Sequence, residues 1–308
     1  MGKDNDSFQR EINRISNAIN QIRNPGDLCF CMLSNSCLCD SSVVAREHIR
    51  ALDERVHFDC LVHLGDILRG NNPEKVSRRI LRQELEAYRD ALGNGKLFVV
   101  QGEQDGYRDE AFCGQLVCGI MRDDIWHEDT AFIDAYENVQ RKGDAPYYYV
   151  DFPHYSTRLI FLCSSFCEFD GDNKLFERYP FFDIKQLAWL QNEALKADEG
   201  WKVILFSHVM PKSRFETGKD PFIYGGFAGE KFLNILQRAQ TEQMISVVGW
   251  CAGHYPCDCE TKVASINHMV IGSPTIEEEL WDAAVLKADE RKLYLFRFGA
   301  GNDRVISY

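Results

Sequence analysis

Carboxylate and imidazole side chains follow four separate apolar runs of this 308-residue sequence. Gly65-Asp66 and Gly102-Glu103 come after two of these runs, and Ser207-His208 and Gly253-His254 come after two others. Each run is short and apolar, which is typical of a buried strand. Aspartate, glutamate and histidine are the side chains that bind metal ions and carry out acid–base chemistry. The sequence therefore indicates a site built from loops at strand ends.

The first half of the chain alternates strands and helices. Strands are predicted over residues 28–33, 58–64 and 96–100, with helices over 41–55 and 73–92 between them. This alternation favours parallel strands joined by right-handed crossovers. Functional loops in such sheets lie beyond the carboxyl ends of the strands, which is where the first motifs fall.

The second half is predicted to be richer in strands. Paired strands are expected over 147–152 and 158–163, followed by a helix over 183–197 and a strand over 202–206. A further helix and strand are expected over 230–239 and 245–249. Short strands follow over 263–266, 268–271, 283–287, 292–298 and 305–308. An amphipathic helix over 8–23 precedes all of these elements. We expect one domain over residues 1–308, with residues 1–27 carrying the N-terminal helix packed on it.

Composition limits the partners and the location. The formal net charge is −12 without any run of Lys or Arg, so general nucleic-acid binding is not expected. No stretch approaches 18 apolar residues and no signal-peptide pattern begins the chain, so we expect a cytoplasmic protein without membrane contact. The 12 cysteines are expected to be free thiols of a reducing compartment rather than a disulfide framework.

The order and spacing of the motifs resemble the calcineurin-like metallophosphoesterase family, whose blocks read DxH, GDxx, GNHD, an isolated His and GHxH. The resemblance covers nearly the whole chain, and residues 147–151 and 186–190 look like the middle of bacterial members. It implies an α/β fold with two facing mixed β-sheets flanked by helices, a four-layer αββα sandwich. It also implies hydrolysis of phosphoesters at two bridged metal ions.

The resemblance assigns one metal site of the family to residues that this chain keeps. Asp66 matches the bridging aspartate, His208 the isolated histidine, and His254 the first histidine of GHxH. Glu103 replaces the asparagine of GNHD, and Gln104 replaces its histidine. Two carboxylates, two neutral imidazoles and one divalent cation sum to zero charge, and four ligands suit Zn²⁺, or Mn²⁺ and Fe²⁺ with added waters.

The other metal site of the family is largely replaced. Its DxH positions fall on Asn35 and Cys37, which are weaker ligand candidates, and its last histidine falls on Pro256, which has no side-chain donor. We therefore predict one divalent ion held by Asp66, Glu103, His208 and His254, without a second ion. Asp105, which matches the closing aspartate of GNHD, is expected to fix its loop.

Three functions stay open on the sequence. The first is a weak phosphoester hydrolase in which Gln104 and Asn35 position the phosphoryl oxygens, since an amide does not release a proton as an acid does. Its substrate would be a small phosphoester or a phosphoprotein. The second is an inactive binding or scaffold protein with the same fold. The third is a metal or redox role for the Cys-x-Cys pairs Cys29/Cys31, Cys37/Cys39 and Cys257/Cys259. The oligomeric state is not predicted.

Overall fold

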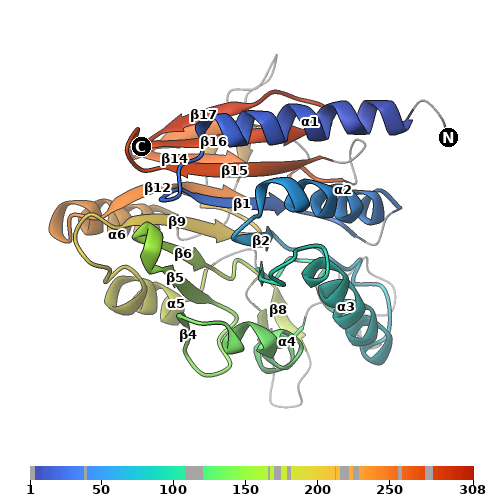
Figure 1. The fold of residues 1–308 in the computed structure, drawn as a ribbon. Coiled ribbons are helices and arrows are strands. Elements are labelled where there is room, and N and C mark those ends of the chain that lie inside the picture. The colour runs from blue at the N-terminus through green and yellow to red at the C-terminus, as the bar shows by residue number, and fades with distance from the viewer. Residues whose placement is uncertain are drawn as a thin grey trace.

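The computed structural model describes most of the chain, as Figure 1 shows. The described residues are 4–37, 40–107, 121–165, 167–169, 175–178, 182–211, 213–215, 222–224, 229–255, 259–274 and 280–308. Pro256, Cys39 and Cys257, which the sequence predictions name, lie outside the described residues.

The first sheet has six strands and joins the beginning of the chain to its end. Their order is β17-β16-β15-β1-β2-β3. The strands are β1 Leu28–Leu33, β2 Cys60–His63, β3 Leu97–Val99, β15 Trp281–Lys287, β16 Lys292–Phe298 and β17 Arg304–Ser307. β1, β2 and β3 pair in parallel, as the alternation of strands and helices predicts. β15 pairs antiparallel with β1, beside the parallel strands.

The second sheet has seven strands in the order β13-β14-β12-β9-β6-β5-β4. The strands are β4 Val139–Arg141, β5 Tyr148–Phe152, β6 Thr157–Phe161, β9 Lys202–Ser207, β12 Ser246–Ala252, β13 Glu260–Val263 and β14 Ile266–Val270. β6, β9 and β12 run parallel to one another, so the carboxyl ends of β9 and β12 lie on the same edge. Two short hairpins, β7–β8 (Cys167–Phe169, Leu175–Arg178) and β10–β11 (Ser213–Phe215, Phe222–Tyr224), are separate from both sheets.

Side chains of β9 show how the layers stack. Ile204 and Phe206 belong to the core between the two sheets, where the Phe206 ring lies 6.2 Å from that of Phe30 on β1. Val203 and Leu205 point to the other side of the strand, into a second core. This two-residue period is what a strand buried on both faces requires.

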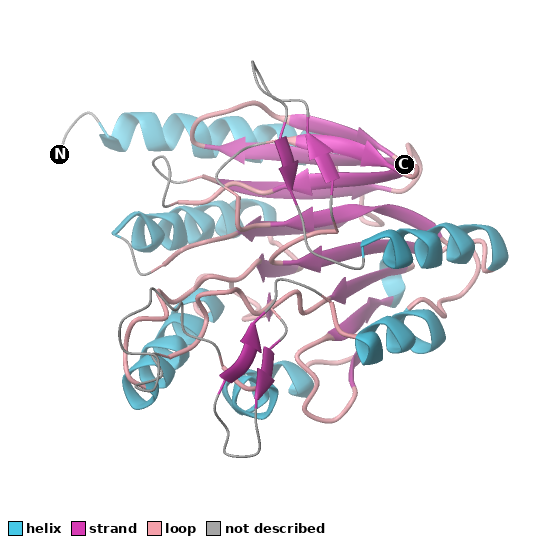
Figure 2. Cartoon of the chain, turned by 180° about the vertical axis from the view of Figure 1, so that it is seen from behind, coloured by secondary structure: helices cyan, strands magenta, loops and turns pink. Residues whose placement is uncertain are grey.

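Helices cover the outer faces of both sheets. α1 (Asp4–Ile22), α2 (Asp40–Val56) and α3 (Glu74–Arg89) contribute apolar side chains to the core of the first sheet, and α5 (Ile184–Trp189) and α6 (Gly229–Glu242) contribute to the second core. α1 and α2 are nearest the viewer in Figure 1, whereas α6 is nearest in Figure 2. The four-layer αββα sandwich that the resemblance implies is therefore present.

Two expected elements differ from the structure. The strand predicted over 263–266 is wrong, because Ala264 and Ser265 form a turn with φ of 51° and 66° between β13 and β14. The helix predicted over 183–197 is shorter. Asp183 caps its start by accepting from the backbone N–H of Gln186, and a π-helical turn over Leu190–Ala194 ends it.

Candidate metal centre

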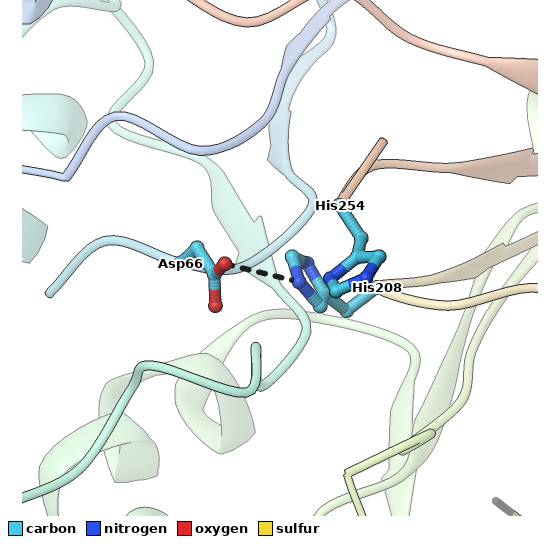
Figure 3. Close-up of side chains that lie close together, drawn as sticks. All are labelled: Asp66, His208 and His254. Atoms are coloured by element: carbon cyan, nitrogen blue, oxygen red, sulfur yellow. Dashed lines mark ion pairs between the residues drawn. The ribbon is translucent and has the colours of Figure 1, made fainter. Parts of the chain in front are cut away.

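Three of the predicted ligands converge where loops from both sheets meet. Asp66 follows β2, His208 follows β9 and His254 follows β12. One ligand atom from each lies within 4.8 Å of the others. Figure 3 shows the three side chains grouped together. Asp66 and His208 are buried, whereas the side chain of His254 is 35% exposed, so the group opens to solvent on the His254 side. This separation suits a metal ion bound by all three.

His208 is oriented by a backbone carbonyl. Its Nδ1 donates to the Leu64 oxygen at 2.7 Å, because a carbonyl can only accept. Nε2 is thereby turned toward Asp66, 3.2 Å from Oδ2. Burial alone would lower the pKa of His208, but the Asp66 charge and the hydrogen bonds outweigh burial and raise it to about 9. A metal-binding histidine commonly donates the N–H of its other ring nitrogen to a backbone carbonyl or a carboxylate, which fixes the orientation of the ring.

Asp66 is held by Gln104, from the loop that follows β3. Its Oδ1 accepts from the backbone N–H of Gln104 at 2.7 Å, and its Oδ2 accepts from the Gln104 side-chain amide at 3.2 Å. Burial opposes ionisation of Asp66, but its neighbours, His208 foremost, outweigh burial and lower its pKa. Gln104, which we predicted to position phosphoryl oxygens, therefore orients the Asp66 carboxylate.

Asp105 fixes the two loops against each other. Its carboxylate accepts from the backbone N–H groups of Asp66 (2.9 Å), Ile67 (2.7 Å), Leu68 (2.9 Å) and Gly102 (2.9 Å). The residue is fully buried, and burial together with the Asp66 charge raises its pKa to about 6. The sequence led us to expect that Asp105 fixes its own loop, and the structure shows that it also fixes the loop that carries Asp66.

The backbone of the site is strained at four residues that are not glycine. Asn35, Cys37, Asp66 and His254 have φ of 49°, 42°, 56° and 62°. Each such residue costs on the order of 1 kcal/mol and persists only where its surroundings hold it, and such strain gathers at functional sites. Positive φ also occurs at seven other described non-glycine residues, so the strain accompanies the site without singling it out.

Gly102 allows the Asp66 loop and the Glu103 loop to touch. A Cβ at Gly102 would lie 2.1 Å from the Asp66 nitrogen and 2.3 Å from Asp66 Oδ1. These atoms are held by Asp105 and Gln104 and cannot move away cheaply.

We therefore expect Gly102→Ala to lower the free energy of unfolding by at least about 2 kcal/mol and to weaken metal binding. Urea unfolding of this variant beside Gly26→Ala gives the test, because a Cβ at Gly26 meets nothing within 4 Å. Equal midpoints for the two variants would show that the contact is not tight.

Asn35 forms hydrogen bonds to the backbone of the loop that carries His254. Its Oδ1 accepts from the His254 backbone N–H at 2.9 Å, and its Nδ2 donates to the His254 carbonyl at 3.4 Å. Cys37 is also turned to the backbone, with its nitrogen and Sγ 3.0 and 3.3 Å from the Asp66 carbonyl oxygen. The structure thus places both residues beside the centre and gives each a structural contact there.

Glu103 lies at the open side of the group. Its Oε2 is 3.8 Å from Nδ1 of His254, and its side chain is 20% exposed. It is not one of the three converging residues, but it borders them through His254. A second carboxylate is therefore next to the centre, on the solvent side.

His63 is a residue of the site region that the motifs did not reveal. It is fully buried, accepts from the Gly65 N–H at 3.2 Å through Nδ1, and has Nε2 3.0 Å from the Ser36 hydroxyl. Burial, helped by the His208 charge, lowers its pKa to about 3, so it stays neutral and joins the two loops. Its position at the end of β2, three residues before Asp66, is the signal that would have found it.

The described cysteines only partly match the expectation of free thiols. Cys29, Cys31, Cys37, Cys60, Cys163 and Cys251 are free. Cys259 is disulfide-bonded, so the prediction is wrong at this residue. A disulfide sulfur is not a thiolate ligand, which removes Cys259 from any four-cysteine metal site.

The structure is similar to solved metallophosphoesterases over nearly its whole length. A dimetal phosphatase from Danio rerio superposes with a TM-score of 0.63 at 16% identity, over 91% of this chain and 99% of that one. The chain has a metallophosphoesterase fold. GAP50, the anchor in the inner membrane complex of Plasmodium, superposes on this fold with a TM-score of 0.53 at 10% identity, over 91% of this chain and 89% of that one.

Sequence comparisons add nothing to the structural likeness. No protein-family model and no curated protein matches the chain. Within the described residues, every helix is too short or too polar to cross a membrane.

Proposed function

We propose that the chain is a phosphoester hydrolase that depends on one divalent metal ion and turns over slowly. The convergence of Asp66, His208 and His254 at the carboxyl ends of β2, β9 and β12, in a metallophosphoesterase fold, carries the proposal. The substrate class would be a small phosphoester or a phosphoprotein, and a cytoplasmic location remains our expectation.

The donor set fits a divalent cation. Asp66, His208 and His254 offer one carboxylate and two imidazoles, and Glu103 borders them as a fourth ligand or as a hydrogen-bonding partner of His254. With both imidazoles neutral, the four side chains balance a 2+ charge. Zn²⁺ takes such a set in four-coordinate geometry, and Mn²⁺ and Fe²⁺ take it with added waters.

Two observations favour one ion over two. Asn35 uses both ends of its amide on the His254 backbone, and Cys37 contacts the Asp66 carbonyl. Both residues stand where the family keeps ligands of the other ion. At the remaining ligand position the sequence has Pro256.

The residues of the chain would act mainly by holding and orienting. A divalent ion here would supply a Lewis acid for a phosphoryl oxygen and a more acidic water. Gln104 would keep Asp66 turned to the centre, and Leu64 would keep Nε2 of His208 turned to it. Because Gln104 has no acidic proton to give the leaving group, a factor of about 10²–10⁴ in rate is missing.

A non-catalytic binding protein is the second candidate. It is favoured by the ion pair between Asp66 and His208 and by the Gln104 amide on Asp66, which stabilise this carboxylate through groups of the chain alone. The structural likeness to GAP50, named as an anchor, is in keeping with this role.

Hydrolysis of aryl phosphate mono- and diesters, measured with Mn²⁺, Zn²⁺, Fe²⁺ and Ni²⁺, separates the two candidates. We expect slow, metal-dependent turnover that His254→Ala removes and His154→Ala keeps, since His154 is an exposed histidine that contacts the Pro25 carbonyl. Metal binding without turnover would favour the binding protein. Turnover that survives His254→Ala would contradict the proposed site.

A further inference from the structure

A cavity lies at the end of the sandwich away from the candidate metal centre. Its volume is about 320 Å³, within the range of small-molecule sites. Lys96, which lines it, precedes β3, whereas Glu103 follows β3. Asp59 precedes β2, whereas Asp66 follows it. The cavity is therefore at the amino ends of the strands whose carboxyl ends carry the centre.

Aromatic rings form a continuous wall of this cavity. The ring of Phe98 lies 5.6 Å from that of Tyr136 and 6.3 Å from that of Phe152, and the Phe152 ring lies 6.4 Å from that of Tyr155. Phe98 is on β3 and Phe152 is on β5, whereas Tyr136 precedes β4 and Tyr155 follows β5. Phe98 is only 1% exposed, and its ring is inclined at 77° and 81° to those of Tyr136 and Phe152, so the partly exposed rings of the other three residues provide the apolar surface for a ligand ring.

The wall is fixed before any ligand arrives. The Tyr155 hydroxyl donates to Asp59 Oδ1 at 2.7 Å, and the Tyr136 hydroxyl donates to the Gly95 carbonyl at 2.7 Å. Rings held in this way lose little conformational freedom when a ligand binds, which favours affinity.

Four charged side chains line the cavity. The carboxylates of Asp59 and Asp151 are each paired with an arginine, whereas Lys96 and Glu137 carry opposite charges of their own. Asp59 is paired with Arg23 at 3.0 Å, and Asp151 is paired with Arg158 at 2.6 Å. Lys96 and Glu137 are exposed at the cavity, and their side chains form no ion pair within the described part of the chain. A cation and an anion at one cavity complement a ligand that carries both charges.

We propose that this cavity binds a small aromatic zwitterion of the aromatic α-amino acid type. Its ring would pack on Tyr136, Phe152 and Tyr155, its carboxylate would face Lys96, and its ammonium group would face Glu137. An ammonium group is also attracted to the faces of the tyrosine rings. This site is independent of the candidate metal centre and of the function proposed for it.

Calorimetric titration of the full chain with L-tryptophan and L-phenylalanine tests the proposal. We expect saturable binding with one ligand per chain, and no binding of glycine, which carries both charges but no ring. Lys96→Met and Glu137→Gln, both at exposed positions, should each weaken the affinity for L-tryptophan roughly three- to fivefold. Lys262→Met and Glu260→Gln are matched controls on β13, at the opposite edge of the second sheet, and should leave it unchanged.

Ligand analogues show whether the charges act as assigned. Tryptophan amide lacks the carboxylate, so Lys96→Met should not weaken its binding further. Indole-3-propionate lacks the ammonium group, so Glu137→Gln should not weaken its binding further. The proposal is overturned if neither amino acid binds saturably, if glycine binds equally well, or if the β13 controls weaken binding as much as the cavity variants do.

Discussion

Replacement of Asp66 by asparagine is expected to abolish metal uptake and to lower phosphoester hydrolysis at least about a thousandfold. Asp66 supplies the only carboxylate among the three converging described residues, and it is the ion-pair partner of His208. Asparagine keeps the shape but removes the charge that a divalent ion needs. Metal analysis of the purified variant and an aryl phosphate assay measure both effects.

Asp53→Asn is the matched control for this variant. Asp53 is a buried carboxylate on α2 that accepts from the backbone N–H groups of Phe58, which precedes β2, and of Gly93, which precedes β3. Its replacement should cost stability and leave metal content unchanged. Retention of metal and turnover in Asp66→Asn would show that the centre lies elsewhere.

Asp105→Ala is expected to lower the free energy of unfolding by about 3–5 kcal/mol. The substitution removes one buried carboxylate and leaves four backbone N–H groups of two loops without their acceptor. Because Asp66 is then no longer fixed, metal affinity should fall as well. In urea unfolding the midpoint should drop while the slope stays the same.

Asp105→Asn separates shape from charge at this position. Its amide oxygen can still accept from Ile67 and Leu68 if its amide nitrogen faces Asp66 and Gly102, which themselves offer only N–H donors. An intermediate loss of stability is expected. An unfolding midpoint that stays unchanged in Asp105→Ala would contradict the role assigned to this carboxylate.

The parts of the fold that depend on local patterns were predictable. The apolar runs before Gly65 and Ser207 are β2 and β9, and parallel pairing of the first strands follows from the helices between them. Since parallel strands bring their carboxyl ends to one edge, the approach of the loops after β2 and β3 could be expected as well. Asp66 and His208 follow strands of different sheets, so their meeting was expected from the family resemblance alone. The turn at Ala264 and Ser265 could not be predicted, because neither residue is a glycine or asparagine, the residues that most often take a positive φ.

The parts that depend on distant contacts were not predictable. Pairing of β15 with β1 joins residues 250 or more positions apart, which no local period encodes. The side-chain amide of Asn35 could bind either a metal ion or a backbone group. It binds the His254 backbone because the loop after β12 lies against it in the fold. The hydrogen bond between the Asp105 carboxylate and the Asp66 backbone likewise depends on a contact between segments that are distant in the sequence.

The number of metal ions per chain tests the account most directly. Equilibrium dialysis against Zn²⁺ or Mn²⁺, followed by metal analysis, should give one ion per chain, and His208→Ala and His254→Ala should each reduce this to near zero. Two ions per chain would mean that the positions of Asn35 and Cys37 still serve a second ion. No bound ion, or one that both histidine variants retain, would contradict a centre built on Asp66, His208 and His254.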